Sequence, residues 1–140
     1  MEKQHLPFSQ IIDYVREFHD AFKVGYAREP EGRLSEAEYR LRHRLMHEEN
    51  EEYLEAAAEG DLVGVADALG DQLYILCGTI LKHGLQHKIV EVFEEIQLSN
   101  MSKLDANGEP IFREDGKVMK SELYFRPNIA KVINASEVEL

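Results

Sequence analysis

The sequence predicts an all-α fold, an antiparallel bundle of about four to five helices with a short hairpin-like C-terminal extension. Three observations predict it. Apolar residues recur at helical spacing over much of the chain, signals for a helix start and a helix end flank the longest segment, and turn-forming pairs gather after Leu104. The 140 residues, 44% of them hydrophobic, suit a single domain over residues 1–140 with one core.

The first helix is predicted from about Phe8 to Val24, because five apolar residues recur there at helical spacing. These residues are Ile11, Ile12, Val15, Phe18 and Phe22. Gly25 and residues 29–32, which contain Pro30 and Gly32, then predict a loop. The apolar residues of this first helix are therefore expected to pack against the rest of the bundle.

A long second helix is predicted to begin after Ser35 and to run to about Glu59. Ser35 and Glu38 have the spacing of a capping box, in which the two side chains bond to each other's backbone N–H groups. Gly60 is expected to end the helix, because glycine readily adopts the left-handed conformation that closes a helix. Ser35 and Gly60 therefore mark the two ends of this element.

The third helix is predicted from about Leu62 to Lys82, with Asp61 as its N-terminal cap and Gly84 at its end. It is apolar nearly all round, which is typical of a helix that is buried on most sides. In a chain this short, we expect a partner subunit to supply part of that cover.

A fourth helix is predicted over roughly residues 88–101. The pattern then changes, because turn signals follow at Asn107-Gly108, Asp115-Gly116 and Pro127. Residues 110–120 are predicted to form a small hairpin, and residues 128–140 are expected to hold one more short helix or strand.

Charge and composition exclude several classes of protein. The formal net charge of −11 argues against a surface that follows nucleic-acid phosphates, which needs clustered lysines and arginines. The longest apolar stretch, residues 62–81, is interrupted by Asp67 and Asp71, so no membrane span is expected. The first ten residues lack the apolar core of a signal peptide, and the sole cysteine, Cys77, has no intrachain partner. We therefore expect a cytoplasmic protein.

Three glutamates in the second half of the long helix continue its apolar side. Glu52 follows Leu45 by seven residues, which places it within about 20° of Leu45 around the helix. Glu49 follows Leu45 by four residues, and Glu48 adjoins it. Carboxylates on a buried face need a positive partner, because an unpaired buried ion costs several kcal/mol. The remaining glutamates are predicted to form a solvated face: Glu51, Glu55 and Glu59.

Asp67 and Asp71 give the same indication on the third helix. They are the only charged residues between Leu62 and Leu81, and their spacing of four puts them on one helix face. One interpretation is that each aspartate pairs with an arginine of another helix, such as Arg42 or Arg44. The other interpretation is a metal site shared with the glutamates.

The turn at Gly60 favours the shared metal site. Two antiparallel helices bring residues equally far from the turn to one level, and Glu52 lies eight residues before Gly60 while Asp67 lies seven after it. Carboxylate oxygens suit Mg²⁺ or Mn²⁺, whereas zinc prefers His or Cys. His43 and His47 have a spacing of four, but we interpret them as ordinary helix residues.

The acidic segments resemble the all-α nucleoside triphosphate pyrophosphohydrolases, the superfamily of MazG, the dimeric dUTPases and phosphoribosyl-ATP pyrophosphohydrolase. The motif of that superfamily is EExxE, followed by ExxD on the next helix. The residues that match it are Glu48, Glu49, Glu52 and Asp71. The position three before Asp71 is Ala68 here, and Asp67, one residue earlier, is suggested to take the place of the missing glutamate. Residues 100–104, 115–120 and 124–127 also resemble a MazG-like subgroup.

The resemblance implies a MazG-like all-α core, a homodimer or dimer of dimers, and a nucleoside triphosphate substrate. It implies Mg²⁺, for which Mn²⁺ could substitute, and cleavage between the α and β phosphates to give a nucleoside monophosphate and pyrophosphate. Removal of unwanted nucleotides is the leading interpretation of the physiological role. The alternatives are a phosphoribosyl-ATP pyrophosphohydrolase activity and a non-catalytic helical dimer that binds nucleotide or metal.

The resemblance also implies roles for individual residues. The expected metal ligands are Glu48, Glu49, Glu52, Asp67 and Asp71. All of these except Asp67 are also expected to be catalytic, and Glu48 could instead position the attacking water. The expected substrate-binding residues are Asn100, Lys103, Lys117, Lys120 and Tyr124, with the lysines holding phosphates as point charges. By analogy, Phe18, His19 and Phe22 could help to form a base pocket, although core packing is the default for both phenylalanines.

Overall fold

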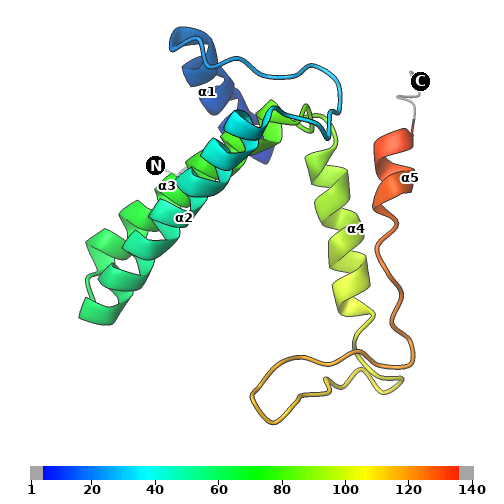
Figure 1. The fold of residues 1–140 in the computed structure, drawn as a ribbon. Helices are drawn as coiled ribbons and strands as arrows, with labels where there is room; N and C mark the ends of the chain where they lie inside the picture. Colours follow the sequence, from blue (N-terminus) through cyan, green and yellow to red (C-terminus); the bar gives the residue numbers. More distant parts are fainter. Residues whose placement is uncertain (1–4, 136–140) are drawn as a thin grey trace. The chain divides into compact units, whose positions relative to one another are not determined.

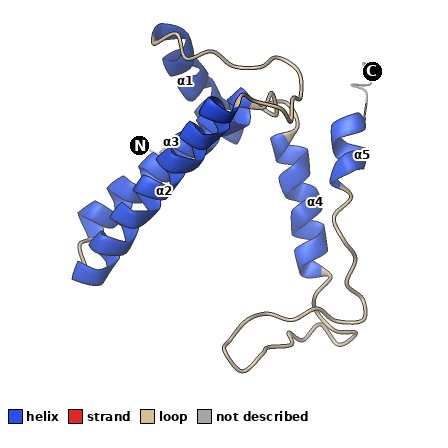
Figure 2. Cartoon of the chain, in the orientation of Figure 1, coloured by secondary structure: helices blue, strands red, loops and turns tan. Residues whose placement is uncertain are grey.

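The computed structural model describes residues 5–135 and confirms the all-α prediction (Figure 2). Five helices and no strand occur among these residues. The helices are α1 (Phe8–Ala21), α2 (Glu36–Glu59), α3 (Leu62–Lys82), α4 (Ile89–Met101) and α5 (Ile129–Asn134). The chain divides into two compact units, residues 1–87 and 88–140, and the single domain expected from the sequence stays a prediction.

Helices α2 and α3 form an antiparallel hairpin, and they lie side by side along their lengths (Figure 1). The predicted signals set its ends. Ser35 Oγ accepts from the Glu38 N–H at 3.2 Å, and Glu38 Oε2 accepts from the Ser35 N–H at 3.3 Å. Gly60 ends α2 with φ 67°, and Asp61 caps α3 by accepting from the Gly64 N–H at 3.1 Å. These local side-chain and backbone preferences therefore fix the tight turn between the two helices.

Polar contacts fix the register of the α2–α3 hairpin. Arg42 Nε donates to Thr79 Oγ1 at 3.0 Å, and Gln72 Nε2 donates to Asn50 Oδ1 at 3.0 Å. Moving eight residues along α2 from Arg42 to Asn50 thus corresponds to moving seven residues back along α3. This nearly one-for-one register decides which acidic residues meet in the hairpin.

Helix α1 packs on α3 through a buried core that includes Ile12 and Val15. It ends at Ala21, three residues before the predicted end at Val24. His19 is the physical reason. Its ring is buried, with 3% of its surface exposed, and Nδ1 donates to Gly25 O at 2.8 Å, which turns the chain back on itself after the helix.

Arg42 lies buried in the hairpin without a carboxylate partner among the described residues. Besides its bond to Thr79, its Nη2 donates to Ile75 O at 2.9 Å, and burial lowers the pKa of the guanidinium. Gly78 makes room for it, because a Cβ there would lie 2.5 Å from Arg42 Nη2 and 2.9 Å from His19 Nε2. Burial also lowers the pKa of His19, and the Arg42 charge adds to this effect, so a neutral ring beside the guanidinium is favoured.

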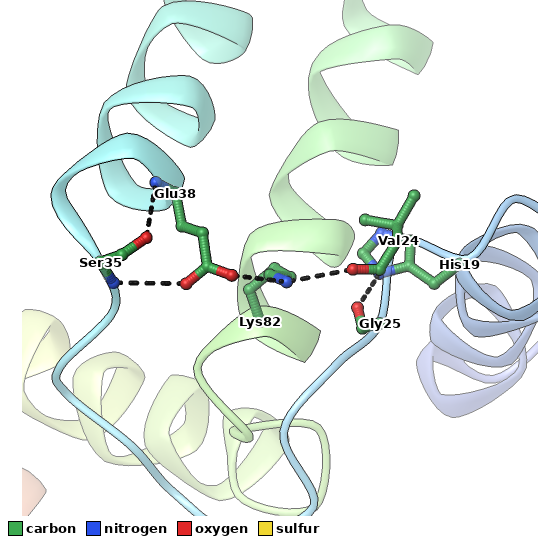
Figure 3. A network of polar contacts seen from close by, with 6 residues as sticks. All are labelled: His19, Val24, Gly25, Ser35, Glu38 and Lys82. Atoms are coloured by element: carbon green, nitrogen blue, oxygen red, sulfur yellow. Dashed lines mark hydrogen bonds and ion pairs between the residues drawn. The ribbon is translucent and has the colours of Figure 1, made fainter.

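Lys82, at the end of α3, contacts residues on both sides of the connection between α1 and α2 (Figure 3). Lys82 Nζ donates to Val24 O at 3.2 Å and forms an ion pair with Glu38 Oε1 at 3.5 Å. Beyond the helix, the backbone N–H of Glu31 donates to His83 O at 2.8 Å. These contacts with the end of α3 hold residues 25–34, the connection between α1 and α2, in place.

The second unit consists of α4, α5 and the connection between them. Ser99 Oγ donates to Phe125 O at 2.8 Å, and Lys88 Nζ donates to Ala135 O at 2.7 Å. Helix α4 begins one residue after the predicted Lys88, which occupies the N-cap position. Residues 110–120 fold back as predicted but pair at one antiparallel bridge, between Phe112 and Val118, within the described chain. Helix α5 lies in the segment predicted to hold a helix or strand, of which residues 136–140 fall outside the described residues.

Among residues 5–135, no helix combines the length and the apolar character that a bilayer crossing requires.

Candidate metal centre

Three carboxylates meet between α2 and α3, near the middle of the hairpin. Glu49, Glu52 and Asp71 each offer one oxygen, and these oxygens all lie within 4.8 Å of one another. Glu49 is half-buried, and its Oε2 is shielded from solvent and has no hydrogen-bond partner within the described residues. A buried acceptor without a partner costs free energy, so this oxygen is suited to a cationic ligand.

The cluster is electrostatically unfavourable without a cation. Burial raises the pKa of the Glu49 carboxyl, and the nearby Glu52 carboxylate raises it further. Asp71 and Asp67 act in the same direction with smaller effects. A divalent cation bound among these oxygens would reverse the balance, because it attracts every carboxylate that now repels its neighbours.

The register explains which acids are brought together. Since Asn50 faces Gln72, Asp71 lies at a height along the hairpin between Glu49 and Glu52. Counting residues from Gly60 had predicted that Asp67 lies opposite Glu52. The observed pairing differs from that prediction by about one helical turn. Asp67 is close enough to raise the pKa of Glu49 but stands outside the group of three. Glu48 is exposed and also lies outside the group.

The interpretation that arginines neutralise the two aspartates is not supported. Arg42 points to Thr79 and Ile75 instead, and the ion pairs of residues 5–135 include neither Asp67 nor Asp71. Ala68, which stands where the superfamily has a glutamate, is 1% exposed. A carboxylate at position 68 would therefore be buried. The two acids of α3, Asp67 and Asp71, lie instead on the neighbouring face of the helix.

The predicted substrate-binding residues all belong to the second unit. Asn100, Lys117 and Lys120 are exposed, whereas Lys103 and Tyr124 are half-buried. Lys120 Nζ lies 4.7 Å from the centroid of the Tyr124 ring, a cation–π contact that holds both side chains near the bridge of residues 110–120. Their roles in binding phosphates stay predictions.

An aromatic cluster contains Phe18 and Phe22, which were expected by analogy to help to form a base pocket, and Tyr74, which was not anticipated from the sequence. Phe18 packs against Phe22 and Tyr74, with ring centroids 4.4 Å and 5.6 Å apart. The expected core packing is wrong for Phe22, which is 68% exposed, and incomplete for Phe18, at 39%. Tyr74 follows Asp71 by three residues, one turn along the same helix. That spacing was the available signal for an aromatic surface beside the metal centre.

The donor set fits Mg²⁺ well. All three groups are carboxylates, the hard oxygen ligands that Mg²⁺ and Mn²⁺ take, and the described residues add no His or Cys to the group. Glu49, Glu52 and Asp71 would therefore hold the ion, with further positions left to water and substrate oxygens.

Mg²⁺ is expected to raise the melting temperature of the protein by several degrees, because it binds the folded state and relieves the repulsion among the acids. Thermal unfolding with Mg²⁺ and with EDTA measures the effect. The double variant Glu49→Gln/Asp71→Asn should lose it. An equal Mg²⁺ shift in that variant would place the stabilising ion elsewhere.

Comparison with known families gives a match over most of the chain. Residues 15–100 match the family model described as phosphoribosyl-ATP pyrophosphohydrolase, which covers more than half of the 140 residues. The match includes the acids of α2 and α3 and ends before Lys103. No curated protein matches the chain.

Proposed function

Since this chain belongs to the phosphoribosyl-ATP pyrophosphohydrolase family, we propose that it is a Mg²⁺-dependent enzyme that cleaves between the α and β phosphates of a nucleotide. Family membership implies a pyrophosphohydrolase that acts on phosphoanhydride bonds. The observation that carries the proposal is the cluster of Glu49, Glu52 and Asp71, whose carboxyl oxygens converge within 4.8 Å inside the matched region.

The chemistry divides between the ion and the protein. Bound Mg²⁺ supplies charge neutralisation of the polyphosphate and polarisation of its oxygens. Glu49, Glu52 and Asp71 hold and orient it, and Asp67 adds negative charge at the edge of the centre. Glu48 is the proposed group that positions the attacking water. The water adds to the α or the β phosphorus, and the bridging oxygen leaves with the other. The products are pyrophosphate and a nucleoside monophosphate, or phosphoribosyl-AMP when the substrate is phosphoribosyl-ATP.

The aromatic cluster is the proposed platform for the base. Phe18, Phe22 and Tyr74 offer exposed aromatic surface beside Asp71, and bases stack on such rings regardless of their identity. Stacking at this place would leave the phosphates of the same nucleotide within reach of the acids. Asn100, Lys103, Lys117, Lys120 and Tyr124 remain the proposed phosphate and ribose contacts.

Two substrates are proposed. The family match favours phosphoribosyl-ATP. A nucleoside triphosphate, removed to clean the nucleotide pool, is the second proposed substrate, since residues 115–120 and 124–127, which lie beyond the matched residues, resemble a MazG-like subgroup. Both substrates carry the same α–β phosphoanhydride, so the centre described above serves either one.

We also propose a homodimer or dimer of dimers and a cytoplasmic location. Contact with a second copy would cover four large aliphatic residues of α3 that are exposed. These are Leu62, Val63, Leu69 and Leu73. The proposed location rests on Cys77, the sole cysteine of the sequence, which is a free thiol and has no disulfide partner within the chain.

A substrate panel tests the proposal. Phosphoribosyl-ATP and the common ribo- and deoxyribonucleoside triphosphates are incubated with the protein and Mg²⁺, and pyrophosphate and orthophosphate are measured separately. Pyrophosphate release that EDTA abolishes is expected for at least one substrate. Orthophosphate as the product would contradict α–β cleavage, and tight nucleotide binding without any turnover would favour the non-catalytic alternative.

A further inference from the structure

Two histidines stand one turn apart on the side of α2 opposite the metal centre. His43 and His47 are both exposed, and their rings are nearly parallel, with centroids 6.4 Å apart and an interplanar angle of 7°. At 100° per residue, they point between about 120° and 180° away from Glu49 and Glu52 around the helix. A ligand at the two rings would therefore be separated from the acids by the helix itself.

The histidines line a shallow groove of about 350 Å³ on this side of the hairpin. Its lining residues are His43, Met46, His47, Asn50, Gln72 and Leu76. The floor is fixed, because the hydrogen bond from Gln72 Nε2 to Asn50 Oδ1 joins α2 to α3 beneath the rings. The backbone that carries both histidines is thus held by the hairpin register.

The two rings are free to bind a ligand. The buried His19 is engaged with Gly25 O and His83 with Glu31 O, but neither His43 nor His47 has a hydrogen-bond partner within residues 5–135. Their neutral ring nitrogens are therefore available as electron-pair donors.

The spacing suits a shared metal ion. Four residues of α-helix rise about 6 Å, which matches the ring separation, and a rotation about the side-chain bonds can direct one nitrogen of each ring to a single ion at about 2.0–2.1 Å. Histidines four apart on one helix face are the arrangement found in helical zinc sites. Imidazole nitrogen favours Zn²⁺, Cu²⁺ and Ni²⁺, whereas Mg²⁺ favours the carboxylates on the other side.

We propose that His43 and His47 form a second metal site, for a borderline divalent cation of the Zn²⁺, Ni²⁺ and Cu²⁺ group. Water fills the remaining coordination positions. An ion bound to both rings joins two successive turns of α2. This site is independent of the proposed enzymatic activity, since it shares no ligand with the acid cluster.

Calorimetric titration with Zn²⁺ tests the site. The titration uses the Glu49→Gln/Asp71→Asn protein in excess Mg²⁺, so that the acid cluster does not contribute Zn²⁺ binding. One Zn²⁺ per chain is expected. His43→Gln or His47→Gln should weaken Zn²⁺ binding by at least roughly 10–100-fold. That is the cost of losing a residue that only hydrogen-bonds to a metal ligand, and loss of a ligand itself should cost no less.

The control is His5→Gln, which removes an exposed histidine that has no other histidine within four residues and should leave Zn²⁺ affinity unchanged. Circular dichroism in EDTA checks that the variants fold. If His43→Gln/His47→Gln fails to fold, the single variants provide the same comparison. Zn²⁺ affinity in the folded double or single variants equal to that of the parent would overturn the proposal.

Discussion

Replacing Glu49 by glutamine is expected to lower Mg²⁺-dependent pyrophosphate release by at least about 100-fold while the helices stay intact. A metal centre contributes several kcal/mol of transition-state stabilisation, and each 1.36 kcal/mol is a factor of about ten in rate. Glu49 is half-buried, and its Oε2 has no hydrogen-bond partner among residues 5–135. The rate is measured by pyrophosphate release, and helical content by circular dichroism.

The control is Glu59→Gln, at the exposed end of the same helix, which should retain full activity. In EDTA, the Glu49→Gln protein should be at least as stable as the parent. The neutral amide removes the repulsion between the Glu49 carboxylate and those of Glu52 and Asp71. Full activity of Glu49→Gln would contradict the assignment of the metal centre. Asp71→Asn should reproduce the loss of activity, since the same cluster holds both residues.

Gly84→Ala is expected to lower the free energy of unfolding by about 3 kcal/mol or more. Gly84 has φ 67°, which costs alanine about 1 kcal/mol. Its added Cβ would also overlap the backbone carbonyl of Glu29. Moving that segment away would break the backbone bonds from Ala27 to Leu81 and from Glu31 to His83, each worth about 1 kcal/mol. Urea unfolding followed by circular dichroism measures the difference.

Gly60→Ala is the matched control. Gly60 has the same φ of 67°, but a Cβ there would meet nothing within 4 Å. It should therefore cost only the conformational term of about 1 kcal/mol. Equal losses in the two variants would show that the contact between Gly84 and Glu29 contributes nothing to stability.

The sequence was most informative where a short stretch of chain decides the structure. The bounds of α2 and α3 follow from Ser35, Gly60 and Asp61, because a cap is made by side chains and backbone groups a few residues apart. The end of α1 was predicted three residues too late, since it is set by His19, whose ring bonds to a carbonyl beyond the helix. Periodicity does not report such a contact.

The metal centre was predicted in composition but not in register. The need of buried carboxylates for a cation pointed to Glu48, Glu49, Glu52, Asp67 and Asp71, of which the structure groups Glu49, Glu52 and Asp71. Counting residues from the turn paired Glu52 with Asp67, and only the bonds between the helices show that Asp71 is the one that meets it. The position of Arg42 was equally hidden, because the space for its guanidinium comes from Gly78 on the other helix.

The acids of the metal centre all come from one helical hairpin, between Glu49 and Asp71. Bringing them together closes only the short loop at Gly60, and the entropy lost on loop closure grows with loop length. Contacts between residues close in sequence are the kind associated with rapid folding. The centre is therefore topologically local, and its assembly does not have to wait for the chain beyond residue 87.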